Sequence, residues 1–78
     1  MKNTRNAEVY KVASKYAQAL LGYKNARMRA TEAYNAVNAI AKKNGWTLKE
    51  RESVWNSELR YALKFWDVPV SNLMAFNH

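Results

Sequence analysis

The chain has 78 residues, a formal net charge of +7 and no cysteine. This length allows one domain, residues 1–78, and the lack of cysteine excludes disulfides, thiolate zinc sites, iron–sulfur clusters and cysteine nucleophiles. Because a core of this size stabilises a fold by only about 3–5 kcal/mol, we expect reinforcement by homodimerisation or by a partner.

The positive charge lies in the N-terminal part of the chain. Residues 1–49 carry ten Lys or Arg and two Glu, whereas residues 50–78 carry three Lys or Arg and four carboxylates. This asymmetry favours an acidic protein surface or nucleic acid as the partner. No signal peptide is visible and no apolar run approaches the roughly 20 residues of a membrane span, so we expect a cytoplasmic protein without membrane contact.

The first element is predicted to be a helix, because the N-terminal half is rich in alanine and the whole chain has only two Gly and one Pro. Apolar residues keep one heptad phase from Val9 to Ile40, with Arg27 as the charged exception. This continuous phase predicts one long helix over residues 5–43. A break near Gly22 to Asn25, which would give two shorter helices, is the alternative.

A helix stop and a helix start follow each other in residues 42–50. Lys42 and Lys43 suit a helix C-terminus, Asn44-Gly45 suits a left-handed cap, and Thr47 with Glu50 forms a capping box. The spacing of Ala41 and Gly45 also fits a helix-turn-helix. We disfavour that motif because Arg51 stands where an apolar residue would normally pack and because Glu50 and Glu52 would approach DNA phosphates.

The next helix is predicted from Leu48 to about Trp66, ending before the breaker Asp67-Val68-Pro69. Its apolar residues cover about half of its circumference, which is more than one neighbouring helix can bury. Ser71 could cap a short helical turn over residues 72–76. The predicted fold class is therefore all-α, a small helical bundle or helical dimer with the second helix antiparallel to part of the first.

Two sets of residues are candidates for binding. Aromatic residues and arginine are common anchors in protein interfaces, and the second half of the chain offers Trp46, Arg51, Trp55, Tyr61, Phe65 and Trp66. A basic face of the predicted long helix and its C-terminus comprises Lys11, Lys15, Lys24, Arg29, Lys42 and Lys43. The wide spacing of these cations is more typical of a solvated surface than of a region that tracks phosphates.

Arg27 and Glu52 are each isolated among apolar neighbours, so we hypothesise that they form an interhelical ion pair. No catalytic pattern is present: the one histidine is His78, no Gly-rich phosphate loop occurs, and Glu50 and Glu52 point to different helix faces. We therefore predict a protein that is not an enzyme, with no cofactor and no metal.

These observations favour a small non-catalytic regulator, an adaptor or inhibitor, that docks on a larger protein or nucleoprotein with an acidic surface. Small cysteine-free regulators of the kind that viruses carry would fit this description. The alternative is sequence-independent binding of DNA or RNA through the basic face.

Overall fold

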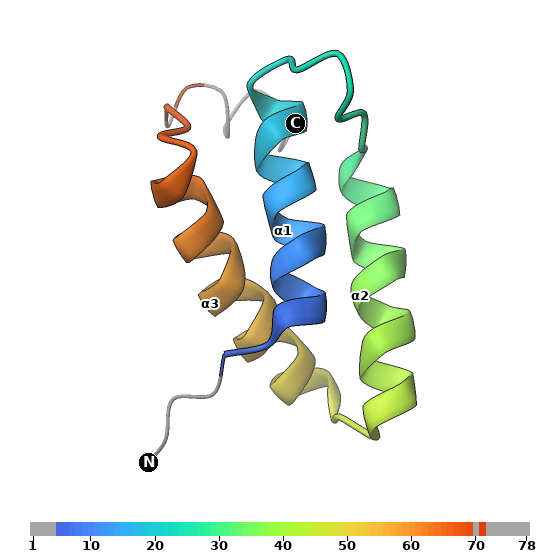
Figure 1. The fold of residues 1–78 in the computed structure, drawn as a ribbon. Helices are drawn as coiled ribbons and strands as arrows, with labels where there is room; N and C mark the ends of the chain where they lie inside the picture. Colours follow the sequence, from blue (N-terminus) through green and yellow to red (C-terminus); the bar gives the residue numbers. More distant parts are fainter. Residues whose placement is uncertain (1–4, 70, 72–78) are drawn as a thin grey trace.

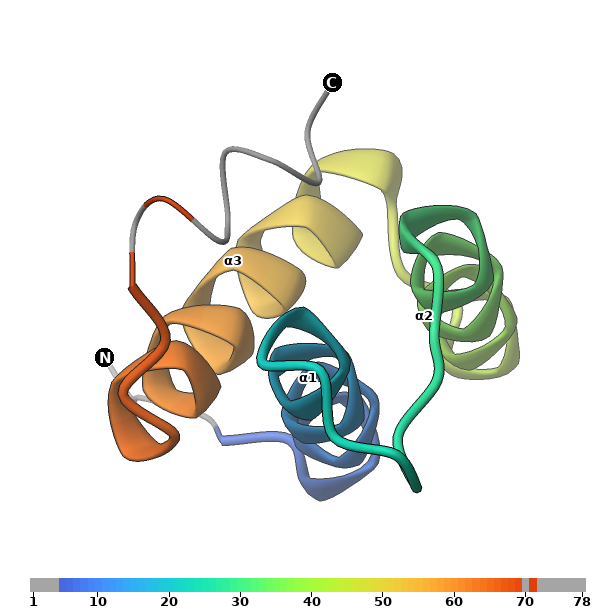
Figure 2. The same ribbon diagram turned by 90° about the horizontal axis from the view of Figure 1, so that it is seen from above.

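Three helices make up the fold. The structure, a computed structural model, describes residues 5–69 and residue 71, and its helices are α1 (Ala7–Leu20), α2 (Ala30–Asn44) and α3 (Leu48–Phe65). The chain runs up through α1, down through α2 and up again through α3, so that α2 is antiparallel to both other helices (Figure 1). Viewed along the bundle, the three helices form a triangle (Figure 2). The all-α bundle expected from the sequence is confirmed.

The prediction of one helix over residues 5–43 is wrong, and the alternative break is the one observed. The amide of Tyr23 donates to the carbonyl of Gln18 at 3.2 Å and that of Gly22 to Ala19 at 3.0 Å, which is the Schellman pattern of a helix end. Gly22 has a φ of +83°, in the left-handed region where glycine is favoured. The break lets α2 fold back so that its apolar side packs on the same core.

The turn between α2 and α3 follows the prediction. Gly45 has a φ of +70°, and the amide of Trp46 donates to the carbonyl of Ala41 at 2.9 Å in a second Schellman end. The Thr47 hydroxyl accepts from the Glu50 amide at 3.1 Å, and the Glu50 carboxylate accepts from the Thr47 amide at 2.7 Å. Stop and start signals that act within a few residues were therefore predictable from the sequence.

The other end of α3 uses a residue other than glycine. Asp67 has a φ of 54°, and the amide of Val68 donates to the carbonyl of Leu63 at 3.0 Å, so the same end pattern is built around an aspartate. The observed end at Phe65 agrees with the predicted end near Trp66. The predicted helical turn over residues 72–76 lies outside the described residues.

The core is centred on the contact between α1 and α3. Ala13, Ala17 and Ala62 are fully buried, and their small side chains allow the two helices to approach closely. Trp55, Leu59, Leu63 and Trp66 cover this alanine seam from the sides. A second cluster, formed by Tyr16, Leu20 and Ala33, joins α2 to α1. In the part of the chain that is described, no helix is long and apolar enough to cross a membrane.

Candidate partner-binding groove

A groove separates α2 from α3. It encloses about 520 Å³ and is lined from both helices and from Tyr16 of α1. Its inner surface is mainly apolar, being formed by Tyr16, Ala33, Val37, Trp55 and Leu59. Ala30, Thr31, Tyr34, Arg51 and Glu52 complete the lining. The groove therefore presents a hydrophobic inner surface beside polar and charged groups, a combination typical of binding pockets.

Arg51 spans the two helices at the groove. Its guanidinium donates a hydrogen bond to Oδ1 of Asn38 on α2, lies 4.5 Å from the centre of the Tyr34 ring and is 3.7 Å from the carboxylate of Glu52. Only 7% of Arg51 is exposed. Large side chains therefore lie between α2 and α3 and keep these two helices apart. In contrast, α1 and α3 approach each other closely through their alanines.

The hydroxyl of Tyr34 is affected by the same cluster. Hydrogen bonding to Arg51, with a smaller effect from Asn38, lowers the pKa of Tyr34 below its ordinary value of 10.0. Deeper in the groove, burial raises the pKa of Tyr16 above that value. The ring of Tyr16 is tilted against Trp55 with centroids 6.1 Å apart. The inner end of the groove, at Tyr16, is therefore less polar than its outer edge, at Tyr34.

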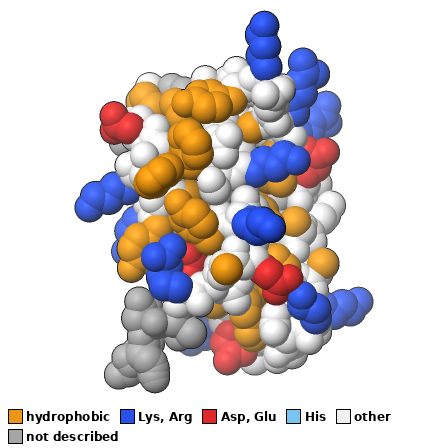
Figure 3. All heavy atoms as spheres, viewed as in Figure 1, with side chains coloured by type: hydrophobic (Ala, Val, Ile, Leu, Met, Phe, Trp, Pro, Cys, Tyr) orange, Lys and Arg blue, Asp and Glu red, His pale blue; other side chains and the backbone are white. Residues whose placement is uncertain are grey.

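The six predicted anchors are not brought together. Arg51 and Trp55 line the groove. Tyr61 and Phe65 lie elsewhere on α3, and Trp66 follows directly after it. Trp46 lies half-buried in the turn before that helix. One face of the molecule accordingly carries a band of hydrophobic side chains over α1 and α3 (Figure 3).

Trp66 is held in place rather than offered to solvent. Its indole donates to the hydroxyl of Ser14 at 2.9 Å, and its ring meets Tyr23 and Phe65 edge to face at 5.7 and 5.3 Å. Phe65, by contrast, is 71% exposed. Trp66 therefore links the end of α3 to α1.

Glu58 forms a buried charged cluster that the sequence reasoning missed. It is 1% exposed, accepts from the Arg5 guanidinium at 3.0 to 3.2 Å and accepts from the Asn6 amide at 2.7 Å. The guanidinium of Arg5 also lies 4.0 Å from the centre of the Tyr61 ring, and its bonds to Glu58 raise the pKa of Arg5. Glu58 and Arg51 are seven residues apart and lie on the side of the helix that carries Ala62. This shared position could have indicated from the sequence that both charged side chains are buried.

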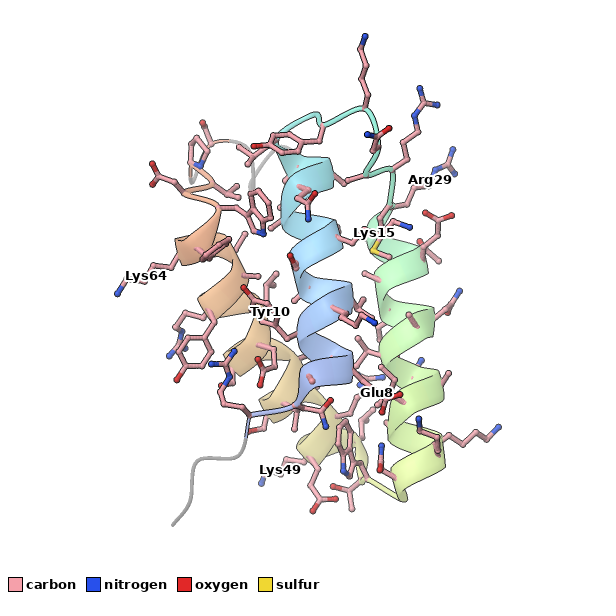
Figure 4. The ribbon with its side chains drawn as sticks, viewed as in Figure 1. Glu8, Tyr10, Lys15, Arg29, Lys49 and Lys64 are labelled. Atoms are coloured by element: carbon pink, nitrogen blue, oxygen red, sulfur yellow. The ribbon has the colours of Figure 1, made fainter. Side chains whose placement is uncertain are left out.

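The predicted basic face is divided in space. Lys11 and Lys15 lie exposed on α1, Lys24 and Arg29 lie exposed in the loop between α1 and α2, and Lys42 and Lys43 lie at the far end of α2. Figure 4 shows Lys15 and Arg29 on neighbouring segments of the molecule, with Lys49 and Lys64 well away from them. The Nζ of Lys43 is paired with Glu8 at 2.6 Å. A continuous basic helix face is therefore not formed.

The hypothesised Arg27–Glu52 pair is wrong. Arg27 is exposed in the α1–α2 loop, while Glu52 on α3 lies beside Arg51. The prediction failed because it placed Arg27 within the stripe of a continuous helix. Among the described residues, no group of three His, Cys, Asp or Glu side chains is placed to hold a metal ion.

Neither protein-family models, curated proteins nor solved structures gave a match for this chain. The chemical character of the groove and of the charged surfaces is therefore the basis for a functional proposal.

Proposed function

We propose that this protein is a small non-catalytic regulator whose α2–α3 groove takes up an acidic amphipathic helix of a larger protein. The observation that carries the proposal is the groove itself, about 520 Å³ of mainly apolar space between two antiparallel helices. Apolar side chains spaced three and four residues apart on a partner helix would enter such a space. A fourth helix laid there would complete a bundle that α2 and α3 leave open.

The residue types around the groove support a protein as the occupant. Trp, Tyr and Arg supply most of the binding energy in protein interfaces, and Trp55, Tyr34 and Arg51 all line this groove. Trp55 and Tyr16 provide broad apolar surface deep in the groove, whereas Tyr34 is half exposed at its mouth.

The positive net charge of the chain favours an acidic partner. The chain carries a net charge of +7, which speeds the encounter with a negatively charged protein and disfavours basic ones. Glu52 at the groove would repel a carboxylate placed directly beside it. We therefore expect the acidic residues of the partner helix to lie away from Glu52 and its apolar residues to face Trp55 and Leu59.

The test is capture from a nuclease-treated cell lysate with the tagged protein and two matched variants. Ala30→Glu places a carboxylate at the groove, and Ala39→Glu makes the same change of charge at an exposed position of α2 outside the groove. We expect wild type and Ala39→Glu to retain the same protein at high salt and Ala30→Glu to lose it. A synthetic peptide covering the acidic helix of that protein should then bind with the same pattern.

Three results would overturn the proposal. Equal loss in the two variants would mean that net charge and not the groove governs binding. Capture of a second copy of this chain alone would assign the groove to self-association. Release of every partner by nuclease treatment would indicate nucleic acid as the link.

A further inference from the structure

The α1–α2 loop and the adjoining surface of α1 carry an uncompensated positive charge. Residues 9–31 contain five Lys or Arg and no Asp or Glu. The five are Lys11, Lys15, Lys24, Arg27 and Arg29, and all of them are exposed. Figure 3 shows Lys and Arg side chains gathered over the upper right of the molecule, around this loop. Clustered cations at one end create a local positive potential that attracts anions.

The cations of the α1–α2 loop lack a carboxylate partner among the described residues. Carboxylates pair with the three cations Arg5, Lys43 and Arg51. Within the described residues, by contrast, no ion pair engages Lys24, Arg27 or the side chain of Arg29. Glu32, the acidic residue next along the chain, uses its carboxylate to accept from the Arg29 backbone amide at 2.8 Å. The loop cations are therefore available to an external anion.

The loop also offers a hollow and an aromatic ring. A depression of about 300 Å³ is bordered by Lys24, Arg27 and Arg29 together with Tyr23 and Met28. Tyr23 is 47% exposed, and its ring is held edge to face against Trp66 at 5.7 Å. A fixed, half-exposed ring beside several cations is the combination with which proteins bind unpaired bases and the phosphates that flank them.

We propose that the α1–α2 loop binds single-stranded nucleic acid, with Lys24, Arg27 and Arg29 contacting backbone phosphates and Tyr23 stacking on a base. A single strand is favoured over a duplex because only unpaired bases present a face to the ring. This site lies outside the α2–α3 groove and shares no lining residue with it. The inference therefore does not depend on the proposed protein-binding function.

The test measures fluorescence anisotropy of a labelled oligothymidylate of about 20 nucleotides, a length that covers the site size of typical single-strand-binding modules, over a range of salt concentrations. One triple variant replaces Lys24, Arg27 and Arg29 by Gln. The control triple variant replaces Lys42, Lys49 and Lys64 by Gln, which removes the same charge at exposed positions elsewhere. Circular dichroism and thermal unfolding establish that both variants keep the fold.

We expect the wild type to bind with an affinity that falls steeply with salt. Loss of three phosphate contacts should reduce the log–log slope by about 2, since each contact on a single strand contributes about 0.7. The loop variant should show this reduction, and the control should keep the slope of the wild type. Tyr23→Ala should weaken binding about tenfold while leaving the slope unchanged, because it removes base stacking but no phosphate contact.

Several outcomes would overturn the inference. Equal effects of the two triple variants would show diffuse charge attraction rather than a site. Equal binding of a polyglutamate of matched charge would assign the loop to acidic proteins, and equal binding of a duplex of the same length would remove the role of the ring. An absence of binding at low salt would also reject it.

Discussion

The two interfaces that α3 makes with its neighbours are built differently. Toward α1 it presents Ala62 to Ala13 and Ala17, and the helices close on each other. Toward α2 it presents Trp55 and Arg51, and a groove remains. Side-chain size at facing positions therefore decides whether two helices close on each other or leave a groove between them.

The same substitution at the two interfaces should change the free energy of unfolding by very different amounts. Ala17→Leu inserts a larger side chain into the fully buried alanine seam and should lower the free energy of unfolding by about 3 kcal/mol. Ala30→Leu, at the groove, should change it by less than about 0.5 kcal/mol because there is room for the added atoms. Urea denaturation measures both. Similar losses in the two variants would mean that the groove is as tightly filled as the seam.

A second, smaller effect is expected at the charged cluster that fastens α1 to α3. Glu58→Gln removes the negative charge that Arg5 and the Asn6 amide share and should cost about 2 kcal/mol, since hydrogen bonds to charged groups contribute about 1.5–3 kcal/mol. Urea denaturation is again the measurement.

The matched control breaks an exposed ion pair. Lys43→Gln removes the pair with Glu8 and should cost less than about 0.5 kcal/mol. If Glu58→Gln and Lys43→Gln cost the same, Glu58 does not fasten the helices.

The smallest effect concerns the two tyrosines of the groove at alkaline pH. Burial raises the pKa of Tyr16, so the stability that comes from its neutral form is present below pH 10.0 and is lost as the pH rises through the folded pKa. Hydrogen bonding to Arg51 and Asn38 lowers the pKa of Tyr34, so its ionisation favours the folded state, an effect fully present above pH 10.0.

Substitution by phenylalanine should therefore act in opposite directions. Tyr16→Phe should reduce the loss of stability between about pH 8 and 11, and Tyr34→Phe should increase it. The free energy of unfolding measured in urea across this range checks both. A change of the same sign in the two variants would contradict the different polarity of the inner end and the outer edge of the groove.

Local signals made much of this fold predictable. The turn between α2 and α3 follows from Gly45, Thr47 and Glu50, whose effects act within one helical turn. The break at Gly22 was predicted only as the alternative, because heptad phase reports the side on which a residue lies and not whether the helix is continuous. A loop of nine residues, 21–29, happens to preserve that phase.

The candidate site depends on information that no single segment contains. Arg51 and Glu58 lie within the apolar side of α3, yet their sequence positions do not reveal that one reaches Asn38 and the other reaches Arg5. The groove arises from the relative placement of two helices, which is set by all their facing side chains together. For this reason the sequence did not reveal that Trp55 and Arg51 line one groove while Trp66 lies apart from it.

A partner that binds at the groove should lie close to Tyr34 and not to the opposite side of α3. Tyr34 at the groove and Tyr61 on the other side are similarly exposed, at 52% and 43%, and each can be replaced by the photoreactive residue benzoylphenylalanine. Irradiation in nuclease-treated lysate should cross-link the partner protein from position 34 and leave position 61 without a product. A cross-linked product from position 61 and none from position 34 would contradict binding at the groove.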